Sequence, residues 1–128
     1  MTIKGRTVGF LGAGNMGEAL IKGLLAAKLV PAQAIFATDV RPERLKELDR
    51  QYGIQVSSDN AELVKHADIV ILGVKPQIMD AVATEIAPAV TRRKLLISIA
   101  AGVATDKIRA RLPRDARLIR VMPNTPAL

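Results

Sequence analysis

Cysteine and tryptophan are absent from this 128-residue sequence, and aromatic residues make up 2% of it. Without cysteine the chain has no disulfide framework, no thiolate ligand for a metal and no thiol nucleophile. We predict no metal site, and the lack of cysteine fits a reducing compartment such as the cytoplasm. The scarcity of aromatic side chains argues against a base-stacking platform for single-stranded nucleic acid.

Long apolar runs are absent as well. The stretch after Lys4 and Arg6 has the order of a secretory signal, a basic region and then an apolar one, but it is short, and Glu18 and Lys22 interrupt the next segment. No segment approaches the roughly 20 apolar residues that a membrane span needs, so we expect no membrane association. The apolar content of 49% is nevertheless enough for one globular domain with its own core.

Positive charge exceeds negative charge, with 19 lysine and arginine residues against 12 aspartate and glutamate residues. The densest basic segments, Thr91 to Lys94 and Arg109 to Arg120, place their charges beside apolar residues and not among aromatic ones. We interpret them as a solvated basic face, with a diffuse field that attracts an anionic small molecule as the alternative. We expect no nucleic-acid partner.

Short apolar runs alternate with segments of helical periodicity along the chain. The expected strands are Thr7–Gly12, Ala34–Asp39, Ile54–Val56, Asp68–Val74, Lys94–Ile99 and Arg117–Met122. Most of these runs are continuously apolar, as in parallel strands that are covered on both faces. Three sets of apolar residues have helical spacing: Met16, Leu20 and Leu24; Leu45, Leu48 and Tyr52; and Ile78, Val82 and Ile86. The alternation predicts an α/β fold, a Rossmann-type doubly wound parallel sheet of about six strands with helices on both faces.

Polar residues mark the expected helix boundaries. Asp59 with Glu62 three residues later is typical of a capping box, and Thr105 is expected to cap a helix that contains Ile108. His66 is the only histidine and falls near the end of the helix that follows Asp59. We therefore interpret it as a helix-terminal surface residue and not as a catalytic base.

Three glycines lie where the first strand meets the first helix. The run Gly12-Ala13-Gly14-Asn15-Met16-Gly17 matches the G-x-G-x-x-G pattern of dinucleotide-binding folds, in the strand-to-helix context that makes the pattern specific. In that pattern the first glycine permits a tight turn, the second lets a pyrophosphate approach the backbone, and the third allows close helix–strand packing. The unpaired N–H groups of the helix N-terminus would face the phosphates. A glycine-rich turn of purely structural use is the alternative.

An acidic residue stands at the end of the second expected strand. Asp39 lies 22 residues beyond Gly17, where a carboxylate can accept hydrogen bonds from the adenosine ribose hydroxyls of NAD and would repel the 2′-phosphate of NADP. We therefore expect NADH to be favoured. Arg41 could pair with a 2′-phosphate if it folded back over the site, and the alternative is a solvent-exposed arginine at the start of the next helix.

Three loops are expected beside the glycine run at the carboxyl edge of the sheet. With the usual strand order 3-2-1-4-5-6, the chain reverses between the first and fourth strands, and ligands bind beyond the carboxyl ends near that point. The loops are Gly73 to Gln77, Ser98 to Val103 and Met122 to Leu128. They are small or proline-constrained, and they lie where a nicotinamide would bind.

The segments FLGAGNMGEAL, LGVKPQ, SIAAGV and RVMPNTPA follow one another in this chain. In this order and at these intervals they closely resemble the N-terminal domain of pyrroline-5-carboxylate reductase, over essentially the whole chain. The resemblance implies hydride transfer from NAD(P)H to the imine carbon of 1-pyrroline-5-carboxylate, giving L-proline in the last step of proline synthesis. It also implies that Gly12 to Gly17 hold the pyrophosphate and Asn60 the adenosine ribose. The nicotinamide half would contact Val74, Lys75, Pro76, Ala100 and Ala101.

Two features depart from the family's pattern. Many members carry Ser-Asn-Arg or a similar phosphate-tolerant set where this chain has Thr38 to Val40, so the coenzyme preference does not follow from the resemblance. The family's chain also continues after MPNTPA into a helical domain that makes the dimer and completes the substrate site, whereas this sequence stops at Leu128. We therefore expect residues 1–128 to be the coenzyme domain of a parent protein that forms homo-oligomers through the missing domain.

Few side chains near the expected nicotinamide site could act on a substrate. A protonated cyclic imine is already electrophilic, so positioning would supply most of the rate. Lys75 is the only cation in the predicted nicotinamide loops and could orient the substrate carboxylate, or it could cap the strand end and point to solvent or to the coenzyme phosphates. Asn124 and Thr125 could hydrogen-bond the carboxamide or the substrate, or they could form the turn of the PNTP segment.

Two other classes of function stay open. A dinucleotide-binding domain without a substrate domain could be a redox-sensing module that binds NAD(H) without turnover. Other two-domain dehydrogenases, acting on hydroxy acids or on deazaflavin, begin with a similar fingerprint, and the MPNTPA segment argues against them.

Overall fold

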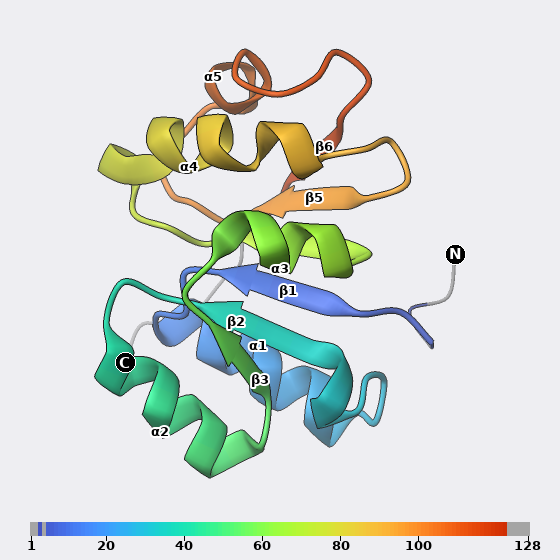
Figure 1. The fold of residues 1–128 in the computed structure, drawn as a ribbon, viewed down its shortest axis with the longest axis vertical. Coiled ribbons are helices and arrows are strands. Elements are labelled where there is room, and N and C mark those ends of the chain that lie inside the picture. Colours follow the sequence, from blue (N-terminus) through green and yellow to red (C-terminus); the bar gives the residue numbers. More distant parts are fainter. Residues whose placement is uncertain (1–2, 4, 123–128) are drawn as a thin grey trace.

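One parallel sheet forms the centre of the computed structural model, which describes residues 3 and 5–122 (Figure 1). Its strands are β1 (Val8–Leu11), β2 (Ile35–Thr38), β3 (Gln55–Ser57), β4 (Ile69–Leu72), β5 (Leu95–Ser98) and β6 (Arg117–Arg120). Their order is β3-β2-β1-β4-β5-β6, and every neighbouring pair is parallel. The six predicted strands and the predicted order are confirmed. The reversal between β1 and β4 creates the crevice in which such sheets bind ligands.

Helices connect the strands on both faces of the sheet. The α-helices are α1 (Asn15–Ala26), α2 (Pro42–Tyr52), α3 (Asn60–His66), α4 (Met79–Ile86) and α5 (Thr105–Arg109). Short 3-10 helices accompany them in the described part of the chain: η1 (Ala32–Ala34), η2 (Pro76–Ile78) and η3 (Ala87–Ala89). Within residues 3 and 5–122, none of the helices is both long and apolar enough to cross a membrane.

The core consists of two apolar layers, one on each face of the sheet. In β4, Val70 and Leu72 pack into the layer formed by α3, α4 and α5, whereas Ile69 and Ile71 pack into the layer formed by α1 and α2 (Figure 1). Successive side chains of a strand point to opposite faces, so a strand between two helical layers must be apolar throughout. The prediction of strands covered on both faces therefore holds for central strands such as β4.

The edge strands are less completely covered. Only Leu118 is buried among the four residues of β6, and Ile119 is 48% exposed. In β3, Gln55 and Val56 are exposed. An edge strand has a neighbour on one side only, and its apolar residues are correspondingly less enclosed.

The buried face of α1 differs in part from the predicted one. Gly17 and Ile21 are its buried residues, while Leu20 and Leu24 are partly buried at the side of the core. Met16 was expected on the buried stripe and instead lines a pocket at the sheet edge. The helix packs against the sheet through the side that carries the small Gly17, because a residue without a side chain lets the two backbones come close.

Two of the predicted helix boundaries can be compared with the structure. The Asp59 carboxylate accepts the Glu62 N–H at 3.0 Å, so Asp59 caps α3, while the Glu62 side chain pairs with His66 at 2.9 Å. His66 is the exposed last residue of α3, as predicted. The expected role of Thr105 was wrong, because Thr105 is already the first residue of α5 and the extended Ala104 occupies the capping position without a side-chain hydrogen bond.

The packing of α1 predicts unequal costs for two neighbouring truncations. Ile21 is fully buried, so Ile21→Ala should lower the free energy of unfolding by about 2 to 5 kcal/mol through lost apolar contacts and the cavity left behind. Leu20→Ala is the matched control and should cost less than about 2 kcal/mol, since Leu20 is only partly buried. Urea unfolding followed by circular dichroism measures both, and equal costs would contradict this orientation of α1.

Candidate functional site

The loop between β1 and α1 turns at a close contact between two backbones. Gly12 has a positive φ of 86°, and a Cβ built on it would lie 2.8 Å from the carbonyl carbon and oxygen of Gly73, after β4. The Gly12 N–H donates to the Thr38 carbonyl at 3.0 Å, and the Gly73 N–H donates to the Leu11 carbonyl at 2.8 Å. A side chain at position 12 would therefore clash with backbone and strain the turn.

The other two glycines of the run have different surroundings. A Cβ on Gly14 would meet no atom within 4 Å among the described residues, so this position faces open space. A Cβ on Gly17 would lie 3.4 Å from the Gly12 carbonyl oxygen, where α1 packs on the loop. The three glycines thus match the roles predicted for a tight turn, an open approach and close packing.

The N-terminus of α1 has the backbone geometry and the charge that suit an anion. Gly14 is its capping residue, with an extended backbone (φ −78°, ψ −162°), and no side chain in the described part of the chain caps it. The first N–H groups of a helix have no partner within the helix and carry the positive end of its dipole. Phosphate groups bind to helix ends of this kind.

Asp39 lies at the end of β2 and contacts the glycine loop. Its Oδ2 accepts the Ala13 N–H at 3.0 Å, and its Oδ1 accepts both the backbone N–H and the Nε–H of Arg41 at 2.9 Å. Burial of the carboxylate raises its pKa, but hydrogen bonds from Arg41 and Ala13 outweigh burial and hold the pKa below the usual 3.8. Asp39 is therefore charged at neutral pH.

Arg41 folds back over Asp39. The guanidinium also approaches Asp39 Oδ2 at 3.3 Å, and the pair leaves the Asp39 side chain 6% exposed while the Arg41 side chain stays 53% exposed. Arg41 meets part of each expectation: its guanidinium folds back onto Asp39, and its side chain stays exposed at the start of α2, while its pairing with a 2′-phosphate stays a prediction. Arg41 also lines the cavity beside the glycine loop.

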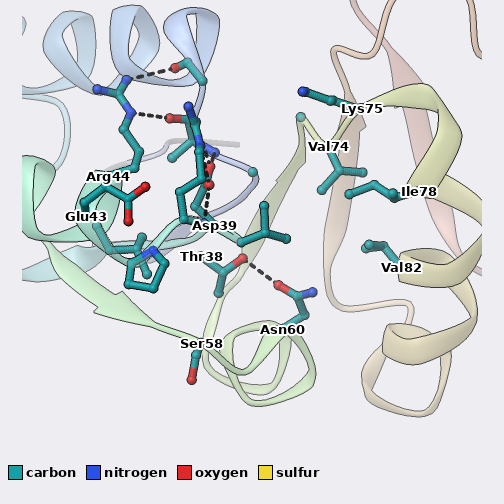
Figure 2. Close-up of a pocket in the computed structure, with 18 of the residues that line it drawn as sticks. Thr38, Asp39, Glu43, Arg44, Ser58, Asn60, Val74, Lys75, Ile78 and Val82 are labelled. Carbon is teal, nitrogen blue, oxygen red and sulfur yellow. Dashed lines mark hydrogen bonds and ion pairs between the residues drawn. The ribbon is translucent and has the colours of Figure 1, made fainter.

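A cavity of about 960 Å³ opens between the glycine loop, α2 and α4 (Figure 2). The predicted site residues that line this cavity are Gly12, Ala13, Gly14, Asn15, Asp39, Arg41, Asn60, Val74 and Lys75. Figure 2 shows Asn60 beside Thr38, whose hydroxyl donates to Asn60 Oδ1 at 2.5 Å. Asn60 Nδ2 donates to Glu85 at 2.9 Å, so Asn60 links β2, α3 and α4 at the cavity wall.

A second cavity, of about 280 Å³, adjoins the first and shares Gly14, Asn15, Gly73, Val74 and Lys75 with it. It is lined further by Met16, Gly17, Pro76, Ala100 and Ala101, the remaining predicted residues within the described part of the chain. Asn124 and Thr125 lie outside the described residues. The structure therefore brings the described candidates together in two connected pockets, and their binding roles stay predictions.

Several lining residues were not predicted. Ile78 and Val82 form an apolar wall opposite Thr38 at the end of β2, and Ser58 also lines the cavity (Figure 2). The helical spacing of Ile78 and Val82 indicated a core stripe, and one side of the same stripe also faces the cavity. Among residues 3 and 5–122, no group of three or more histidine, aspartate or glutamate side chains is placed to hold a metal ion.

The different surroundings of Gly12 and Gly14 predict two separable failures. Gly14→Val should leave stability nearly unchanged but weaken NADH binding by at least about tenfold, because the new side chain enters the space a pyrophosphate needs. Gly12→Val should instead destabilise the fold, because its Cβ meets the Gly73 backbone at a positive φ. Calorimetric titration with NADH and thermal unfolding of both variants would test this. Unchanged affinity in Gly14→Val would remove the loop from the site.

Known proteins match this chain closely. Pyrroline-5-carboxylate reductase from Methanosarcina acetivorans is 43% identical over 125 residues, which are 98% of this chain and 46% of the relative. The solved pyrroline-5-carboxylate reductase of Coxiella burnetii superposes with a TM-score of 0.88 at 33% identity, over 94% of this chain and 45% of that one. The chain thus spans less than half the length of these relatives.

A second solved structure, pyrroline carboxylate reductase from Plasmodium falciparum with NADP bound, superposes with a TM-score of 0.82 at 32% identity. The match covers 96% of this chain and 44% of that one. These similarities confirm the resemblance drawn from the sequence segments. Residues 7–102 also match the family model described as NADP oxidoreductase, coenzyme F420-dependent, and the chain belongs to this family of NAD(P)-binding oxidoreductase domains.

Proposed function

We propose that residues 1–128 are the coenzyme-binding domain of an NAD(P)H-dependent pyrroline-5-carboxylate reductase, which makes L-proline. The observation that carries the proposal is the 43% identity to a curated reductase across 98% of the chain. The pocket geometry supports it, because the predicted coenzyme residues line two connected cavities at the switch point of the sheet. A cytoplasmic location is part of the same proposal, supported by the lack of cysteine.

The residues present fit a dinucleotide. The open space at Gly14 and the helix N-terminus beside it would hold the pyrophosphate. The larger cavity, with its apolar wall of Ile78 and Val82, would take the adenosine half, and the smaller one, with Ala100 and Ala101, the nicotinamide half. When bound, the coenzyme supplies the hydride that adds to the imine carbon of 1-pyrroline-5-carboxylate, and the product is L-proline.

The side chains of this domain would act mainly by positioning. Val74 and Ala100 line the smaller cavity and would exclude water from one side of the nicotinamide ring. Lys75 is exposed and lines both cavities, and its ammonium would orient the substrate carboxylate. We assign no proton transfer to a group in this domain, since a protonated imine carries its own proton.

The substrate site needs a second wall. The cavities lie at one edge of the sheet, and the relatives are more than twice as long as this chain. We propose that a further domain of the parent protein encloses the substrate and forms the homo-oligomer. The coenzyme would bind to residues 1–128 with or without that domain.

A chimera tests this division of labour. Residues 1–122 would replace the matching part of the Methanosarcina acetivorans enzyme, with Gly14→Val in the chimera as the inactive control. The chimera should oxidise NADH in the presence of the imine, while the 128-residue chain should bind NADH but turn over at least about 100-fold more slowly for want of fixed substrate orientation.

Each result of this comparison has a distinct meaning. Equal rates for the chain and the chimera would place the whole substrate site within residues 1–128 and overturn the proposed division. A folded chimera that binds NADH but leaves the imine unreduced would overturn the reductase assignment in favour of a redox-sensing module or of another dehydrogenase.

Coenzyme choice would depend on the pair formed by Asp39 and Arg41. Asp39 favours NADH, because its negative charge would repel a 2′-phosphate. Arg41 is hydrogen-bonded to the carboxylate of Asp39, and its guanidinium stays exposed. An exposed guanidinium would pair with a 2′-phosphate. We propose that Arg41 limits the NADH preference that Asp39 sets, so that both coenzymes are accepted.

Opposite shifts are therefore expected from the two single substitutions. Arg41→Ala should weaken NADPH binding by about tenfold, the effect of losing a charged hydrogen bond, and leave NADH binding within about twofold. Asp39→Asn should move the ratio of the two dissociation constants toward NADPH by about fivefold, because it removes a repulsion of about 1 kcal/mol. Fluorescence titration with each coenzyme measures the ratio. An unchanged ratio in both variants would exclude this pair as its determinant.

A further inference from the structure

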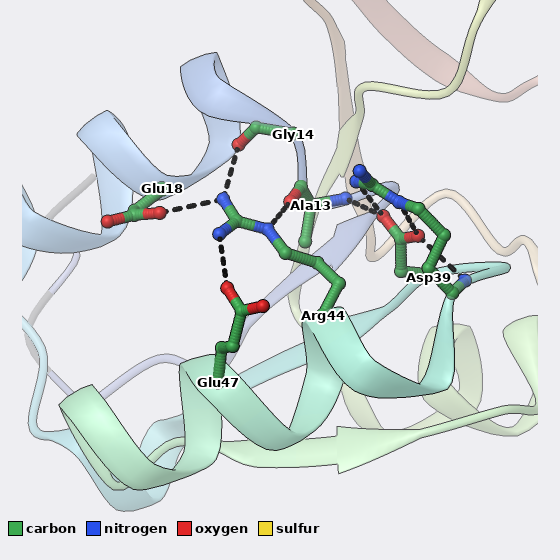
Figure 3. Close-up of polar contacts among 7 residues, drawn as sticks. Ala13, Gly14, Glu18, Asp39, Arg44 and Glu47 are labelled. Carbon is green, nitrogen blue, oxygen red and sulfur yellow. Dashed lines mark hydrogen bonds and ion pairs between the residues drawn. The ribbon is translucent and has the colours of Figure 1, made fainter.

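Arg44 of α2 reaches beneath the glycine loop and binds its backbone (Figure 3). Its Nε–H donates to the Ala13 carbonyl at 2.8 Å, and its Nη2 approaches the Gly14 carbonyl at 3.4 Å. The Arg44 side chain is 14% exposed. The dinucleotide fingerprint includes no residue at this place, so the sequence pattern does not explain why an arginine from the second helix binds this loop.

The guanidinium itself is held by acidic side chains. Its Nη2 donates to Glu18 Oε1 at 2.7 Å, and Glu47 lies 3.5 Å from Nη1 (Figure 3). The Tyr52 hydroxyl donates to the other oxygen of Glu18 at 2.5 Å. Hydrogen bonds from Tyr52 and then Arg44 hold the pKa of Glu18 below its usual 4.5, so Glu18 is charged at neutral pH.

These contacts decide how Arg44 can act. Carboxylates on both sides balance the positive charge of Arg44. The side chain is therefore held in one position and is not a free cation for a phosphate. It holds the Ala13 carbonyl, and it shares the Gly14 carbonyl with the Glu18 N–H of α1, which donates to that oxygen at 2.9 Å. In a trans peptide the C=O and the N–H point to opposite sides. Because Arg44 binds the Ala13 and Gly14 carbonyls, the following N–H groups, those of Gly14 and Asn15, point away from the guanidinium.

Those two N–H groups belong to the residues that line both cavities at the start of α1. We propose that Arg44 is a positioning residue for the coenzyme pyrophosphate. It orients the Gly14 amide and, together with the first hydrogen bond of α1, the Asn15 amide, while Glu18 and Tyr52 hold Arg44 in place. This inference rests on the proposed binding of NAD(P)H. It gives α2 a role in binding the coenzyme and none in hydride transfer.

The test separates diphosphate recognition from general stability. Arg44→Met keeps the aliphatic length and removes the donors, whereas Arg44→Lys keeps the charge but cannot span both carbonyls. Lys46→Met removes one positive charge from an exposed position of the same helix and is the matched control. Binding of NADH, ADP and adenosine to each folded protein would be measured by calorimetry, and by NMR where affinity is low.

Arg44→Met should weaken NADH and ADP by about tenfold, the effect of losing charged hydrogen bonds, and leave adenosine within about twofold. Arg44→Lys should restore part of the loss, and Lys46→Met should change none of the three. The amide resonances of Gly14 and Asn15 should shift in Arg44→Met and stay in place in Lys46→Met.

Tyr52→Phe keeps the ring and removes only the hydrogen bond to Glu18, so it provides a mild second variant should Arg44→Met fail to fold. It should weaken ADP by about twofold to threefold without affecting adenosine. If the Arg44 variants weakened the binding of ADP and adenosine equally, or weakened neither, only the proposed role of Arg44 would be overturned. A wild-type chain that binds neither NADH nor ADP would overturn the proposed function.

Discussion

The close approach of Gly12 to Gly73 is the constraint on which the site depends. The first turn after β1 passes so near the end of β4 that a Cβ at position 12 would lie 2.8 Å from the Gly73 carbonyl. Hydrogen bonds from Gly12 to Thr38 and from Gly73 to Leu11 join the carboxyl ends of β1, β2 and β4 at this point. Residues of the loops that follow β1 and β4 line both cavities beside this contact.

The second βα unit supports the first through charged side chains. Ala13 is fully buried, and both of its backbone groups are bound by that unit: its N–H by Asp39 and its C=O by Arg44. A buried backbone group without a partner would cost about 1 to 3 kcal/mol, so these contacts stabilise the loop in one conformation. The same unit carries Arg41 beside the expected ribose position. In the proposed function, ribose recognition and pyrophosphate recognition are therefore mechanically linked through α2.

Much of the architecture was predictable because it follows from local rules. Continuous apolar runs such as Ile69 to Leu72 belong to strands with a helical layer on each side, and the structure places them there. The glycine run was specific because its strand and helix context could be read from neighbouring residues. Helix details were less reliable: the buried residues of α1 are Gly17 and Ile21, and the cap of α5 is Ala104. Moving the buried stripe of a helix by one residue rotates its buried face by about 100°, yet the spacing of the hydrophobic residues in the sequence hardly changes.

The contacts that refine the site are of another kind. Arg44 and Gly14 are 30 residues apart, Asn60 and Glu85 are 25 apart, and neither pair belongs to a repeating pattern. The fold-back of Arg41 onto Asp39 is local in sequence, yet it depends on one rotamer of a long side chain that had a solvent-directed alternative. Periodicity and short motifs report backbone conformation and burial, so they suffice for the sheet order and the glycine loop. Charged side chains instead select partners by three-dimensional proximity. The contacts of Arg44 with the glycine loop and of Arg41 with Asp39 could therefore be identified only in the folded structure.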